Sequence, residues 1–167
     1  MSNVKSILFS ELLHLNEAET KRWQAWFKVQ PAAVLEVPVT IANAGTVRGL
    51  LFHIFAVELR HSERLIGAEA TPHDSLPKDS VDSLFHIGER ARATLKKFLD
   101  STSDDDLRQM LEIHTVSAGL IHSSKRKLLT HIFIHGIRHW AQLATALREA
   151  GFATNWRHDV VFMQEFE

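Results

Sequence analysis

Four long stretches of the chain are predicted to be helices, and this restricts the fold more than any other feature. In the first, residues 4–29, apolar residues recur mostly at steps of three and four, the period of one helix face. Pro31 then ends the helix. The other three are residues 47–66, 81–100 and 125–150. Four such helices with little strand signal predict an all-α four-helix bundle, with either up-and-down or crossover connections.

Capping residues mark the ends of these helices. Hydroxyl and carboxylate side chains at a helix start accept hydrogen bonds from free backbone N–H groups, and a glycine after the last turn favours a stop. The predicted caps are Thr46, Asp79 or Ser80, and Ser123 or Ser124, with Gly67 and Gly151 as the stops.

The segments between the helices are predicted to be mostly irregular. Residues 31–45 are expected to be irregular or extended, with Pro38 interrupting any strand. A short helical turn is expected after Ser103, and residues 110–123 form a loose hairpin or a loop. The tail, residues 152–167, is rich in apolar residues and is expected to pack on the bundle or on a second subunit.

Composition excludes several classes of function. A length of 167 residues suits a single domain spanning residues 1–167, and a net charge of −1 argues against nucleic-acid binding. The chain has no cysteine, which excludes thiolate chemistry and cysteine metal sites on the protein itself. We find no signal peptide and no apolar run long enough to span a membrane, so the predicted location is the cytoplasm.

Histidine is the one unusual component, with 11 residues. His131, His135 and His139 follow one another at steps of four, which places three imidazoles on one face of the last helix. Two histidines so spaced can bind one divalent ion, and a third ligand must then come from another helix. The best candidate is His53, which is surrounded by apolar residues in the second helix. A buried imidazole needs a partner, because burying an unpartnered polar group costs about 1–3 kcal/mol.

Hydrogen-bonded packing is the competing interpretation for any one of these histidines. His61 is expected to have an outer or surface role near His53. Glu58 is rotated well away from His53 on the helix and is not expected to be a ligand. The remaining histidines are weaker candidates: His14, His73, His86, His114, His122 and His158.

Two stretches resemble the DinB/YfiT superfamily of metalloenzymes. One is Thr46-Val-Arg-Gly-Leu-Leu-Phe-His53. The other is His131-Ile-Phe-Ile-His135-Gly-Ile-Arg-His139-Trp140-Ala141-Gln142, followed by Leu147-Arg-Glu-Ala-Gly151. Trp140 and Ala141 stand where the family usually has Arg-Gly, which puts in doubt any family role for that arginine.

The resemblance implies a homodimeric four-helix bundle with one divalent ion, zinc or nickel, held by His53, His135 and His139. By the same resemblance, His131 and Gln142 lie in a second shell or in the pocket wall. Three protein ligands leave a position open for a substrate, as in catalytic zinc sites.

Three functions are open for such a site. The first is a metal-dependent S-transferase that uses a low-molecular-weight thiol and a small-molecule substrate. The second is a metal-dependent hydrolase, for which His131 is the nearest candidate general base. The third is a stress-related module without catalysis, in which the metal is structural.

Overall fold

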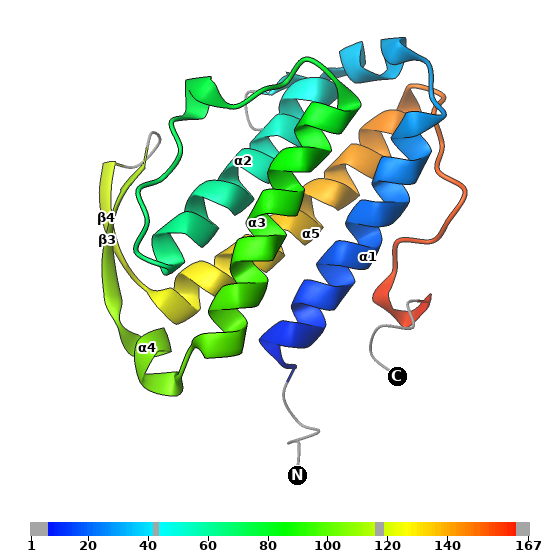
Figure 1. The fold of residues 1–167 in the computed structure, drawn as a ribbon. Coiled ribbons are helices and arrows are strands. Elements are labelled where there is room, and N and C mark those ends of the chain that lie inside the picture. Colours follow the sequence, from blue (N-terminus) through cyan, green and yellow to red (C-terminus); the bar gives the residue numbers. More distant parts are fainter. Residues whose placement is uncertain (1–6, 42–43, 116–118, 163–167) are drawn as a thin grey trace.

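The computed structural model describes residues 7–41, 44–115 and 119–162. Four long helices dominate this part of the chain: α1 (Phe9–Lys28), α2 (Val47–Leu65), α3 (Val81–Ser101) and α5 (Lys125–Glu149). They pack along one another in a bundle (Figure 1). The prediction of an all-α four-helix bundle is therefore confirmed.

The helices follow a crossover topology rather than a simple up-and-down one. Helices α2 and α3 run in the same direction, and α1 and α5 run in the opposite direction (Figure 1). Helix α2 packs against α3 and α5, and α1 packs against the same two helices. Because α2 and α3 are parallel neighbours, the chain between them returns along the length of the bundle.

Side-chain caps start three of the long helices as the sequence predicts. The hydroxyl of Thr46 accepts a hydrogen bond from the Gly49 N–H at 3.3 Å. Ser80 and Ser124, rather than their neighbours, cap α3 and α5, by accepting from the backbone N–H groups three residues on.

Helix α1 begins later than predicted. Ile7 and Leu8 lie outside it and are exposed, and the Leu8 N–H donates to the Glu11 carboxylate at 2.6 Å. This bond satisfies a free N–H group at the start of the helix and marks Leu8 as the residue that precedes it. The apolar pattern in the sequence therefore begins before the helix does. The predicted start at residue 4 lies outside the described residues. The inclusion of Ile7 and Leu8 was wrong.

Short elements connect the helices. A 3₁₀ helix (Ala32–Glu36) precedes β1 (Pro38–Val39), which pairs with β2 (Gly45–Thr46). The expectation that Pro38 interrupts any strand was wrong, because a proline is tolerated as the first residue of a strand. A second 3₁₀ helix (His73–Ser75) lies in the loop before α3.

A β-hairpin directly precedes α5 at the lower end of the bundle. The short helix α4 (Asp104–Arg108) follows Ser103, as predicted. Strands β3 (Met110–Thr115) and β4 (Gly119–Ser124) then pair antiparallel, so the hairpin alternative for this stretch is correct. The residues of its turn, 116–118, lie outside the described part of the chain.

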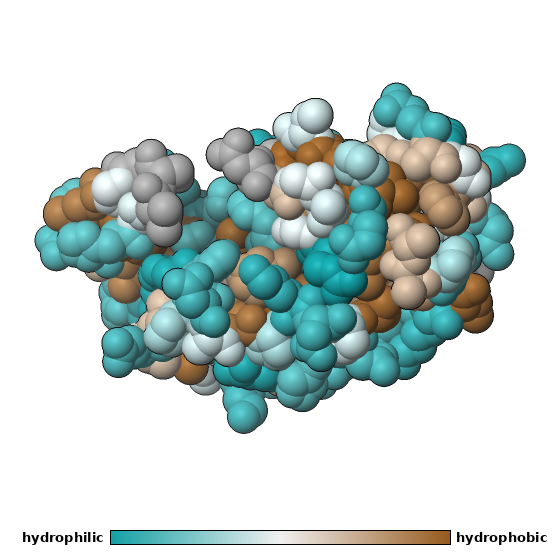
Figure 2. All heavy atoms as spheres, turned by 90° about the horizontal axis from the view of Figure 1, so that it is seen from above, coloured by the Kyte–Doolittle hydropathy of each residue, from teal (hydrophilic) through white to brown (hydrophobic). Residues whose placement is uncertain are grey.

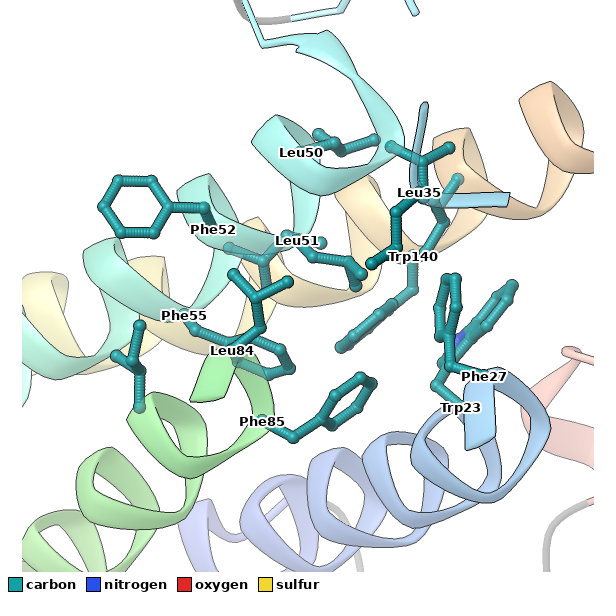
Figure 3. Close-up of a cluster of buried hydrophobic side chains, with 14 of the residues drawn as sticks. Trp23, Phe27, Leu35, Leu50, Leu51, Phe52, Phe55, Leu84, Phe85 and Trp140 are labelled. Atoms are coloured by element: carbon teal, nitrogen blue, oxygen red, sulfur yellow. The ribbon is translucent and has the colours of Figure 1, made fainter. Parts of the chain in front are cut away.

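Aromatic side chains and leucines pack together in a large cluster of the core (Figure 3). The Trp23 ring stacks on Trp140 with centroids 5.6 Å apart, and Phe55 meets both Trp140 and Phe85 edge to face. A Cβ atom on Gly88 would lie 2.5 Å from the Phe55 ring, so only glycine permits this approach of α3 to α2. This packing sets α2 relative to the other helices and thereby positions its histidine.

The tail packs on the bundle over part of its length. Trp156 meets Trp23 edge to face at 5.0 Å, and the His158 Nδ1 lies 2.7 Å from the Glu19 carboxylate. Packing on the bundle is therefore confirmed for this part of the tail. The third 3₁₀ helix (Val160–Phe162) is exposed instead, and residues 163–167 lie outside the described chain.

The surface seen from above is largely hydrophilic, with separate hydrophobic patches between the polar groups (Figure 2). None of the helices within the described residues is both long and apolar enough to cross a membrane.

Candidate metal centre

Two packed helices bring the three predicted histidines together. His53 comes from the N-terminal half of α2, where its neighbours Phe52 and Ile54 are buried. His135 and His139 come from successive turns of α5, and both are buried. Because α2 and α5 pack side by side, residues separated by more than eighty positions in the sequence meet.

The three imidazoles converge on one point. Their candidate ligand nitrogens all lie within 4.8 Å of one another. The Nε2 atoms of His53 and His135 are 3.0 Å apart, and the His139 ring centroid lies 4.3 Å from that of His135. Within the described residues this is the one group of potential ligands with metal-binding geometry.

The surroundings hold these imidazoles in the neutral form. Burial, with smaller contributions from His139 and Arg138, lowers the pKa of His53 to about 4. Burial is also the main cause of the lowered pKa values of His135 and His139. Neutral imidazole has a free lone pair, which is the form that binds a metal.

Gln142 orients the innermost histidine. The Nδ1 atom of His139 donates to the Gln142 Oε1 at 2.7 Å, one turn further along α5. This hydrogen bond assigns the ring proton to Nδ1 and leaves the Nε2 lone pair free for a ligand. In this structure Arg138 Nη2 donates to that Nε2 at 3.3 Å.

The donor set fits a divalent ion. Nitrogens bound to one ion at about 2.0–2.1 Å lie about 3–4 Å apart in a tetrahedral site. The 3.0 Å separation of the His53 and His135 nitrogens and the 4.8 Å limit for the whole group are close to this range. Two neutral Nε2 atoms facing each other need either a shared proton or a shared cation.

A column of imidazoles continues beyond the cluster. The His131 ring lies 5.2 Å from His135, and the His61 ring lies 5.5 Å from His131. His131 is exposed at the edge of the cluster and is not part of the converging group. His61 accepts a hydrogen bond at Nδ1 from Arg64, and burial lowers its pKa to about 3. The sequence places His61 near His53, but its actual neighbour is His131.

Glu58 points elsewhere. Its carboxylate is buried and pairs with the Arg92 guanidinium of α3 at 3.4 Å, while its Oε1 has no hydrogen-bond partner. Burial raises the pKa of Glu58 to about 7, although the charge of Arg92 opposes this rise. The structure thus keeps this carboxylate away from the histidine cluster.

Gln142 also borders an open cavity of about 640 Å³. The cavity lies between residues 37–41 and the C-terminal half of α5, whose Ala141 and Thr145 share this wall with Gln142. Most of its lining is aliphatic, so the cavity provides space for the apolar part of a small molecule.

Three arginines that the sequence analysis did not identify as candidate site residues lie near the histidines. Arg138 directly precedes His139, and its charge lowers the pKa of all four histidines of the cluster and its edge. Arg60 and Arg64 lie seven and eleven residues after His53, spacings that return to the same helix face. That periodicity is the signal that could have identified them.

Comparison with known proteins adds a family and two similar folds. Residues 1–165 match the DinB family. A DinB-like protein from Bacillus subtilis, YjoA, shares 17% identity over 89% of this chain and 94% of its own, with a TM-score of 0.61. YfiT from Bacillus subtilis shares 15% identity over 92% of this chain and 95% of its own, with a TM-score of 0.64. YfiT is described as a probable metal-dependent hydrolase with an unusual four-helix bundle topology. No curated protein is significantly similar.

Proposed function

The chain belongs to the DinB family, and from this premise we propose that it is a divalent-metal-dependent enzyme acting on a small molecule. His53, His135 and His139 would be the metal ligands. One observation carries the proposal: three imidazoles with lowered pKa values converge from two helices. Packing alone gives no reason to gather three unprotonated rings, whereas a cation satisfies all three lone pairs.

The surrounding residues prepare the site before anything binds. Gln142 holds the His139 ring in one tautomer, and the buried faces of α2 and α5 hold the rings in position. A bound divalent ion supplies Lewis acidity toward a thiol or a water molecule. Imidazole ligands suit several transition metals, and we expect zinc or nickel.

We favour thiol transfer over hydrolysis as the reaction. Hydrolysis at a metal commonly requires a general base, and no carboxylate joins the histidine cluster among the described residues. A transferase needs no such group, because a low-molecular-weight thiol bound to the ion would lose its proton to solvent near neutral pH. The open cavity beside Gln142 supports binding of a small-molecule co-substrate.

Hydrolysis is the second candidate. The similarity of the fold to YfiT, described as a probable metal-dependent hydrolase, favours it, and His131 at the edge of the cluster is the side chain placed to act as a base. Replacing His131 by Ala separates the two reactions. A hydrolase loses turnover of ester and amide substrates while retaining its metal, whereas thiol transfer continues.

Metal content is the first test. We expect purified protein without a histidine tag to retain close to one zinc or nickel ion per chain, measured by elemental mass spectrometry. The triple variant His53→Ala, His135→Ala, His139→Ala should lose the ion. A matched triple variant of exposed histidines should keep it; suitable positions are His14, His86 and His122. Equal metal content in both variants would remove the basis of the proposal.

Turnover is the second test. Metal-loaded protein is incubated with a panel of thiols and electrophiles, and loss of free thiol is followed against the triple alanine variant. Thiol consumption that requires the three histidines supports the transferase. A protein that binds metal but turns over neither thiols nor esters would instead be a metal-binding module without catalysis.

We also propose a homodimer in the cytoplasm. Ile134 and Ile137 are exposed on α5, and Val160–Phe162 add exposed apolar side chains in the tail. Light scattering coupled to size-exclusion chromatography tests the dimer, and a monomer at micromolar concentration would contradict it.

A further inference from the structure

Positive charge accumulates around the histidine cluster without a matching negative charge. Arg138 lies against His139, with its Nη2 atom 3.3 Å from the ring nitrogen. At the other end of the imidazole column, Arg64 donates to both His61 and the Arg60 carbonyl. None of these three arginines has a carboxylate within ion-pair distance in the described parts of the chain.

Nearby acidic groups are already engaged. Glu63, the acidic neighbour of Arg64, accepts hydrogen bonds from the Thr71 N–H at 2.7 Å and the Thr71 hydroxyl at 2.6 Å. It also lies 3.8 Å from Arg90. Glu58 pairs with Arg92 on the other side of α2. Within the described residues, Arg60, Arg64 and Arg138 therefore have no carboxylate at ion-pair distance, and the charge of Glu63 acts on Arg64 only from further away.

The Arg60 side chain is only half exposed, and its Nε atom is buried with no hydrogen-bond partner. A buried guanidinium donor without an acceptor costs free energy, more than a neutral group would. The His61 ring accepts at Nδ1 from Arg64, so in the neutral form its proton is on Nε2. Arg60 and His61 thus both present N–H donors at the same end of the column.

The proposed metal ion would add further positive charge beside these arginines. Imidazole binds a metal in its neutral form, so a divalent ion held by three histidines alone would keep its full charge. An ion also needs the same His139 lone pair that Arg138 now occupies, so binding would release the Arg138 guanidinium. The released group has five N–H donors and no protein carboxylate to accept them.

We infer that Arg138 forms an anion subsite beside the histidine cluster, with the Arg60–His61–Arg64 group as a second set of donors at the other end of the imidazole column, and that the substrate carries a carboxylate or phosphate group. Guanidinium groups bind both anions through paired hydrogen bonds. The apolar cavity beside Gln142 lies on the same α5 surface, so the substrate combines an anionic group with an apolar part. This inference rests on the proposed function for the role of the metal, but the arginines can be tested without it.

Calorimetric titration of zinc-loaded protein tests the subsite. The probes are succinate, inorganic phosphate and the neutral analogue succinamide. We expect the anions to bind at least about tenfold more tightly than succinamide, and Arg138→Gln to weaken their binding by about tenfold or more. Binding should also weaken as salt increases. Loss of succinate binding alone in the variant would identify a carboxylate subsite, and loss of both anions a general one.

The controls separate this inference from the metal proposal. Arg148→Gln removes an exposed arginine further along α5 and should change nothing. A second variant, Arg60→Gln with Arg64→Gln, tests the other end of the column. Equal binding of succinate and succinamide, or unchanged binding in Arg138→Gln, overturns the inference. If the wild type holds no zinc, the metal proposal fails, but arginine-dependent succinate binding by the zinc-free protein would still support the subsite.

Discussion

Replacing Gln142 by Leu tests whether its hydrogen bond to His139 supports metal binding. The change keeps the approximate volume of the side chain but removes the acceptor that binds His139 Nδ1 at 2.7 Å. Without this acceptor, the His139 ring is free to rotate and to change tautomer. In the other tautomer the proton occupies Nε2, the atom that faces the cluster, and the ring cannot bind an ion through it.

The size of the effect follows from the role of such partners. Removing a group that orients a metal-binding histidine typically costs 10–100-fold in affinity, or about 1.4–2.7 kcal/mol. Gln142 is half-buried, so solvent replaces the lost hydrogen bond only in part. We therefore expect zinc to bind roughly 30-fold more weakly to Gln142→Leu, near the middle of that range.

Competition with a chromophoric zinc chelator at neutral pH measures this affinity. Gln142→Glu keeps an acceptor at the same place and should retain zinc binding. Thr145→Ala changes another residue of the same cavity wall without touching His139, and it should behave like the wild type. Zinc affinity of Gln142→Leu within twofold of the wild type would refute the role assigned to Gln142.

Three further predictions concern stability, and each is measured by urea denaturation. Glu58 keeps its proton to about pH 7 when folded but loses it near 4.5 when unfolded, so its contribution to the free energy of unfolding falls by up to about 3 kcal/mol as pH rises through that window. Glu58→Gln should lack this fall, and parallel pH profiles for variant and wild type would contradict the argument. Gly88→Ala should destabilise the protein by about 1–3 kcal/mol, because the new Cβ would lie 2.5 Å from the Phe55 ring. Helix propensity alone favours alanine at this position. A gain in stability would therefore contradict the prediction and show that α2 and α3 move apart at little cost. Trp156→Ala should cost about 2 kcal/mol through lost contact with Trp23, whereas Val161→Ala, at an exposed position of the same tail, should cost almost nothing.

Local sequence patterns predicted the helices because they depend on neighbours within a few turns. The apolar periodicity and the caps Thr46, Ser80 and Ser124 located α2, α3 and α5 to within one residue at each end. The start of α1 was less accurate, since Ile7 and Leu8 extend the apolar pattern to residues that precede the helix. Periodicity detects an apolar face, but the hydrogen bond from Leu8 to Glu11 decides where the helix begins.

The sequence by itself determined that His135 and His139 share one helix face, because the spacing of an α-helix is fixed by its backbone. Only the tertiary structure decided that His53 meets them, that Glu58 pairs with Arg92 instead, and that Arg138 faces the cluster. Those contacts depend on how α2 packs against α3 and α5, and that packing depends on side chains far apart in the chain, such as Gly88 and Phe55. Local spacing records which face of a helix a residue occupies, whereas long-range packing decides what that face touches.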